Sequence, residues 1–178
     1  GFGKSSNDSV LTTQDYANII REFLKNEKAV SAVVGHSFGG KVATFLNPKN
    51  LILLSSAGIL EEKSDKVKFK IKMAKILNVF GLAGLTKAFR SKDVNTMSEP
   101  MYETFKNVVD EDFTETFKSY TNNALIFWGE QDRATSLDSG KKIAALIKHS
   151  KFYSYNSDHY FFMKHANDIT TKINDGIL

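Results

Sequence analysis

The chain has 178 residues, of which 42% are hydrophobic and 25% charged. This composition is typical of one soluble globular domain with enough apolar residues for a core, and it excludes a disordered chain. The net charge of +4 is too small to indicate nucleic-acid binding, and the lack of cysteine excludes disulfides and thiolate metal sites. No apolar run reaches the length of about 20 residues that a membrane span needs.

The first third of the chain predicts helices alternating with apolar strands. A helix is expected over 15–25, capped by Thr12 or Thr13, with an apolar face that packs on a sheet. That face consists of Tyr16, Ile19, Ile20, Phe23 and Leu24. The apolar run 29–34 predicts a strand, 39–46 a helix and 51–55 a second strand. The second helix should end at Asn47, because a residue before proline disfavours helical geometry.

Residues 58–120 differ, because they predict helices without intervening strands. The stretch 63–90 combines lysines with an apolar stripe, and glycines at 81 and 84 and a turn near 91–95 divide the region. Its lysines are typical of a solvated helix face, while attachment to an anionic membrane surface is an alternative. A second helix, 99–110, is expected to bury Met101, Phe105, Val108 and Val109.

The last third returns to the alternating pattern. Strands are predicted over 124–128 and 151–155, and helices over 138–147 and 166–173. Strands that alternate with helices predict an α/β fold, a mostly parallel sheet with flanking helices on both faces.

The motif Gly35-His36-Ser37-Phe38-Gly39 stands between the first predicted strand and the helix after it. The Gly-x-Ser-x-Gly pattern alone is weak, since a chain of this length would contain one by chance about one time in twenty. In a strand-turn-helix context, however, the turn is so tight that glycines two before and two after the serine leave room for it. The hydroxyl of Ser37 is then exposed above the sheet as a nucleophile.

Two later loops carry groups that could act with Ser37. The polar turn 129–133 follows a buried strand and offers Glu130 or Asp132 as an acid. Four histidines are present. His36 is more typical of packing or pocket lining, His149 of a helix end, and His165 lacks metal-ligand spacing. His159, in the loop after the last predicted strand, is the remaining candidate base.

The chain resembles the alpha/beta-hydrolase family through three stretches, Gly-His-Ser-Phe-Gly-Gly, Phe-Trp-Gly-Glu-Gln-Asp and Asp-His-Tyr-Phe-Phe, and the resemblance covers nearly all of the chain. The resemblance implies a catalytic triad of Ser37, Asp132 and His159, in the family's chain order. It favours Asp132 over Glu130, and it assigns the backbone N–H of Phe38 to the oxyanion hole. Many relatives have glycine where this chain has Asp158, which puts a second carboxylate beside the base.

The resemblance also implies a domain organisation. Residues 1–57 and 121–178 would form the hydrolase core, and 58–120 a helical cap inserted into it. The strands that open the fold in the family have no counterpart here, so we expect a fragment of a protein about 80 to 100 residues longer. The second oxyanion donor would then be missing, which costs about 100- to 1000-fold in turnover. The unpaired edge of 29–34 would pair with the missing N-terminal segment or a second chain.

The expected chemistry is hydrolysis of a carboxylic ester, or a related acyl bond, of a hydrophobic small molecule through an acyl-enzyme. No cofactor or metal is expected. A serine nucleophile argues against the branches of the family that use aspartate, but C–C bond, amide and acyl-transfer chemistry stay open. The alternative is a non-catalytic or partner-dependent binding module that retains the triad. The sequence does not establish a cellular location, although a cytoplasmic one is favoured.

Overall fold

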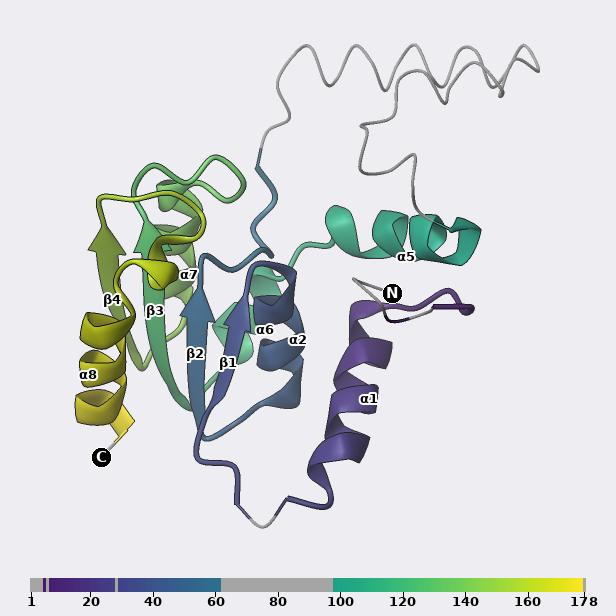
Figure 1. Ribbon diagram of the computed structural model, residues 1–178, viewed down its shortest axis with the longest axis horizontal. Coiled ribbons are helices and arrows are strands. Elements are labelled where there is room, and N and C mark those ends of the chain that lie inside the picture. The colour runs from purple at the N-terminus through teal and green to yellow at the C-terminus, as the bar shows by residue number, and fades with distance from the viewer. Residues whose placement is uncertain (1–4, 6, 28, 62–97, 178) are drawn as a thin grey trace. The chain divides into compact units, whose positions relative to one another are not determined.

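A computed structural model of the protein describes residues 5, 7–27, 29–61 and 98–177 (Figure 1). The chain divides into two compact units. One unit consists of Gly1–Val10 and Glu61–Lys106, and the other consists of Leu11–Leu60 and Asn107–Leu178. The lysine-rich stretch 63–90, its glycines and the turn 91–95 lie outside the described residues. In the described ranges, no helix combines the length and the apolar character needed to cross a bilayer.

The unit Leu11–Leu60 with Asn107–Leu178 contains a four-stranded parallel sheet of order β1-β2-β3-β4 (Figure 1). The strands are β1 (Val33–His36), β2 (Asn50–Leu54), β3 (Asn123–Gly129) and β4 (Ser150–Tyr155). The helices of the described chain are α1 (Thr13–Leu24), α2 (Phe38–Leu46), α5 (Glu99–Val109), α6 (Thr114–Ser119), α7 (Leu137–Leu146) and α8 (Ala166–Ile177), with a 3₁₀ turn η2 (Phe161–Met163). The parallel α/β architecture is therefore as the sequence predicts.

Both faces of the sheet are covered, which explains why β2 and β3 are almost continuously apolar. Leu51 and Leu53 of β2 point to one face, where residues of α2, α6 and α7 pack around them. Ile52 and Leu54 point to the other face, toward η2 and α8. Because successive strand residues alternate between faces, this register directs each apolar side chain into one of two core clusters. Because the four strands are parallel, their carboxyl ends lie at the same edge of the sheet.

The first strand is shorter than its apolar run. The sequence predicts a strand over 29–34, whereas β1 covers Val33–His36. The ladder with β2 begins at the Val33–Leu51 pair, so residues before it have no strand partner among the described residues. β1 is an outer strand of the described sheet, and Val34 is 54% exposed there.

The first helix packs differently from the expectation. Thr12 caps α1 in a capping box with Asp15, as its sequence indicates. However, α1 packs against α2 rather than against the sheet, and it buries Ala17. Ile19 and Phe23, expected in the core, are 53% and 66% exposed. The apolar spacing identified the helix correctly but not the surface that its apolar face contacts.

In helix α5, the burial of side chains differs from the prediction at the C-terminal end. Met101 is 5% exposed and Val108 9%, in agreement with the prediction. Val109 is 49% exposed, because the helix ends there and the chain turns away. The next helix, α6, falls within the stretch expected to form the cap, yet its Phe117 is fully buried in a core cluster with residues of β2 and β3.

A buried lysine of helix α2 contacts the end of α5. Lys41 is 1% exposed, and its Nζ donates to the Val108 carbonyl and to Glu111 Oε2, the latter at 3.3 Å. The Thr13 hydroxyl also donates to Glu111. Burial lowers the pKa of Lys41, while the Glu111 carboxylate opposes that effect. We infer that this ion pair fixes residues 108–111 against the core.

Candidate active site

Ser37 lies between β1 and α2 in a backbone conformation that side chains rarely adopt. Its φ is 53° and its ψ is −120°. Such a residue costs about 1–3 kcal/mol, so its surroundings must hold it. Its N–H donates to Leu54 O at 3.1 Å, and its carbonyl accepts from the N–H groups of Gly40 and Ala57, each at 3.0 Å. The strand-turn-helix context predicted for Ser37 is therefore present.

The residue after Ser37 begins the helix. Phe38 is the first residue of α2, so its N–H has no carbonyl one turn earlier in the same helix to bond. The Phe38 ring packs edge-on against Tyr16 of α1, with ring centroids 5.3 Å apart. This contact packs the start of α2 against α1.

The two glycines of the motif differ in the space around them. A Cβ at Gly35 would lie 2.4 Å from the carbonyl oxygen of Gly39, whereas a Cβ at Gly39 would have nothing within 4 Å among the described residues. The close approach of the turn therefore requires glycine at position 35, and the described residues leave room for a side chain at position 39.

We expect Gly35→Ala to lower the free energy of unfolding by roughly 1–3 kcal/mol, because the added methyl must displace backbone. We expect Gly39→Ala to change it by less than about 1 kcal/mol, in the stabilising direction, because alanine favours a helix. Urea denaturation of both variants measures the difference. Equal losses of stability in the two variants would contradict this steric account.

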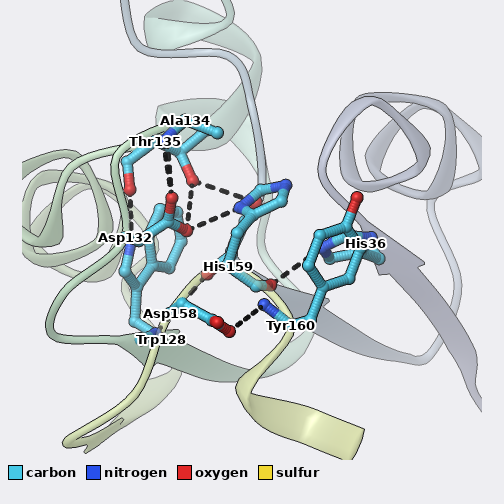
Figure 2. A network of polar contacts seen from close by, with 10 residues as sticks. His36, Trp128, Asp132, Ala134, Thr135, Asp158, His159 and Tyr160 are labelled. Carbon is cyan, nitrogen blue, oxygen red and sulfur yellow. Dashed lines mark hydrogen bonds and ion pairs between the residues drawn. The ribbon is translucent and has the colours of Figure 1, made fainter.

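Asp132 lies in the turn after β3 (Figure 2), and its side chain is fully buried. Its Oδ1 accepts from the N–H groups of Ala134 and Thr135, at 2.8 and 3.0 Å. Its Oδ2 lies 2.6 Å from His159 Nδ1 and 3.0 Å from the Thr135 hydroxyl. Burial raises the pKa of Asp132, but the hydrogen bonds from His159 and the neighbouring donors outweigh it, so that the pKa lies below its ordinary 3.8. Asp132 is therefore a carboxylate at neutral pH.

Three residues that the sequence analysis did not single out support this turn. Trp128 Nε1 donates to the carbonyl of Thr135 at 3.0 Å, which anchors the end of the turn to β3. Ser55 is completely buried at a φ of 42°, its Oγ accepts from the Gly129 N–H at 3.5 Å, and it also hydrogen-bonds Asp132. The spacing Asp-x-x-Thr is a signal for Thr135, because a short carboxylate side chain commonly accepts from N–H groups two or three residues on.

His159 lies in the loop after β4, between Asp132 on one side and His36 and Tyr160 on the other (Figure 2). Its side chain is 15% exposed. Its carbonyl oxygen is 3.2 Å from His36 Nε2, and the two imidazole centroids are 4.5 Å apart. Because His36 directly precedes Ser37, the structure brings the loop of His159 to the end of β1 as well as to Asp132.

The other candidates have different partners. Glu130 Oε1 accepts from the Ser154 hydroxyl at 2.7 Å, and the His165 ring lies tilted against the Tyr155 ring, with the centroids 4.7 Å apart. His149 is exposed at the end of the segment after α7. Asp158, the second carboxylate next to the candidate base, accepts from the Tyr160 N–H at 3.0 Å (Figure 2). Among the described residues, no three His, Asp or Glu side chains gather as metal ligands would.

Comparisons with known proteins give the fold a name. No protein-family model matches the chain. A curated relative, the uncharacterized hydrolase YugF of Bacillus subtilis (strain 168), is 26% identical over 188 residues, which cover 86% of this chain and 68% of that protein.

Similar solved structures cover almost the whole chain. The esterase EaEST from Exiguobacterium antarcticum matches with a TM-score of 0.72 and 20% identity, over 99% of this chain and 78% of its own. A serine hydrolase involved in carbazole degradation, CarC, matches with a TM-score of 0.70 and 17% identity, over 99% of this chain and 75% of its own. The meta-cleavage product hydrolase CumD of Pseudomonas fluorescens IP01 matches with a TM-score of 0.65 and 18% identity, over 97% of this chain and 74% of its own. The chain therefore has the alpha/beta-hydrolase fold.

Proposed function

We propose that this protein is a serine hydrolase that cleaves a carboxylic ester, or a related acyl bond, of a hydrophobic small molecule through an acyl-enzyme. The observation that carries the proposal is the 2.6 Å contact between Asp132 Oδ2 and His159 Nδ1, in a loop that also contacts the residue before Ser37. The hydrolases among the similar proteins support the same reaction class.

The hydrogen bond to Asp132 determines which nitrogen of His159 is the base. A carboxylate only accepts, so Nδ1 carries the proton and Nε2 keeps its lone pair. Nε2 then takes the proton of the Ser37 hydroxyl as its oxygen attacks the acyl carbonyl, and Asp132 stabilises the imidazolium that forms. The Phe38 N–H donates to the developing oxyanion. His159 next gives the proton to the leaving alcohol. Water then attacks the acyl-enzyme carbonyl while His159 takes its proton, and His159 returns that proton to the Ser37 oxygen as the C–O bond of the acyl-enzyme breaks and the acid leaves.

Apolar groups next to the base support a hydrophobic substrate. His36, Tyr160 and Phe162 form an aromatic cluster against His159, and Tyr160 is 57% exposed. An exposed aromatic ring beside a partly exposed base is a suitable surface for an acyl chain. Cleavage of a C–C bond is the second candidate, because CumD, a meta-cleavage product hydrolase, has the same fold.

A fluorophosphonate probe tests the proposed nucleophile. We expect the probe to label Ser37 in the parent chain, as located by peptide mass, and labelling to vanish in His159→Ala. A folded parent chain that is not labelled, or is labelled at another serine, would remove the proposal in favour of a binding module. Nitrophenyl esters of graded chain length, compared with a vinylogous diketone substrate, then separate ester from C–C hydrolysis.

A further inference from the structure

His36 joins the two halves of the site. It ends β1 and precedes Ser37, while the carbonyl that it contacts belongs to His159 in the loop after β4. β1 and β4 are the outer strands of the described sheet, so the loop after β4 reaches across the carboxyl edge of the sheet to make this contact. A carbonyl oxygen only accepts, and the 3.2 Å contact therefore requires a proton on His36 Nε2.

The loop of His159 is held on its other side by groups near the acid. Gln131 N–H donates to the Ser157 carbonyl at 2.9 Å, and Asp132 bonds the imidazole itself. These bonds fix the loop relative to β3, but they do not relate it to β1. The bond from His36 supplies that relation, since it ties the backbone of His159 to the residue next to Ser37.

The surroundings of His36 favour a neutral ring. Burial lowers the pKa of His36, and the neighbouring His159 lowers it further, against the smaller opposing effects of their hydrogen bond and of Asp132. Its ring packs against Phe162 and Tyr160, with centroids 4.8 and 5.5 Å away. A neutral ring donates to the carbonyl without repelling the imidazolium that the proposed reaction forms on His159.

We propose that His36 is a positioning residue, whose Nε2–H holds the backbone of His159 at a fixed place beside the nucleophile turn. This inference rests on the proposed function, since the position matters for proton transfer between Ser37 and His159. His36 does not take part in that transfer. The sequence alone indicated packing or pocket lining for His36, and the tertiary contact adds a directional hydrogen bond.

Two substitutions separate the hydrogen bond from the packing. His36→Gln keeps an N–H donor near the position of Nε2 but loses the ring, and His36→Phe keeps a ring but loses the donor. We expect the rate of fluorophosphonate labelling to fall about tenfold in His36→Phe, the effect of losing one hydrogen bond of ordinary strength. We expect a smaller loss, about threefold or less, in His36→Gln, because a donor is retained. His149→Gln, an exposed histidine outside the site, is the matched control and should not change the rate.

Proton NMR gives a readout that does not need turnover. The proton shared by His159 Nδ1 and Asp132 should give a downfield signal in the parent chain and in His36→Gln. It should broaden in His36→Phe, because a loosened loop exposes it to exchange with water. Thermal melting checks that each variant is folded.

The outcomes are distinct for the two proposals. Parent-like labelling and an unchanged signal in His36→Phe would overturn the positioning role. Equal impairment of His36→Gln and His36→Phe would overturn it too, in favour of ring packing. A parent chain that is not labelled but whose downfield signal still depends on His36 would reject the hydrolase and retain the positioning contact.

Discussion

Replacement of Ser37 by alanine is expected to abolish fluorophosphonate labelling and to lower kcat for a nitrophenyl ester by about 10⁶-fold relative to the parent chain. The reason is that Ser37 is the residue between β1 and α2, and the proposed mechanism uses its hydroxyl as the nucleophile beside the N–H of Phe38. The backbone strain at residue 37 is a property of the turn, so an alanine there should fold with parent-like stability. Labelling, steady-state kinetics and urea denaturation measure the three quantities.

The matched control is Ser154→Ala, which removes an exposed hydroxyl bonded to Glu130 in the last strand. It should leave labelling and turnover unchanged. If Ser37→Ala kept ester hydrolysis within tenfold of the parent chain, Ser37 would not be the nucleophile, whatever its backbone conformation.

Replacement of Asp132 by asparagine is expected to lower kcat by about 10⁴-fold while the loop geometry is retained. An asparagine amide can donate to Nδ1, which moves the imidazole proton to Nε2 and removes the lone pair that accepts from Ser37. Glu130→Gln is the control, because Glu130 bonds Ser154 rather than the imidazole, and it should retain activity. Comparable losses in both variants would contradict the assignment of the acid.

Asp132→Asn is also expected to change how the stability of the fold depends on pH. The pKa of Asp132 in the folded chain is lowered below its ordinary 3.8, so the ionised side chain stabilises the fold at any pH above that ordinary value. This contribution is lost as the pH falls through the lowered pKa. The difference in unfolding free energy between the parent chain and Asp132→Asn should therefore be constant near neutral pH and shrink below about pH 4. A difference that grows on acidification would contradict the lowered pKa.

Local pattern was sufficient for most of the secondary structure. The apolar runs of β2 and β3, the capping box of α1 and the glycine-flanked turn at Ser37 each depend on residues within a few positions of one another. Such features follow from side-chain periodicity and backbone sterics, which a sequence displays directly. The motif order of the resemblance likewise indicated which of two carboxylates, Glu130 or Asp132, would meet His159.

Contacts between segments that are far apart in the sequence could not be predicted from the local sequence pattern. The exposed Ile19 and Phe23 have the spacing of core residues, and nothing in that spacing tells which surface the helix contacts. The burial of Ser55 behind Asp132 also depends on strand register.

The amino-acid sequence by itself determined the alternation of strands and helices, because side-chain periodicity is local, and its resemblance to a family singled out the three residues proposed for the reaction. Only the tertiary structure decided that Asp132 bonds His159, and that the same loop reaches across the sheet to His36. The physical reason is that parallel strands end at one edge, where loops far apart in the chain become neighbours. The hydrogen bonds formed there depend on distances that no local pattern encodes.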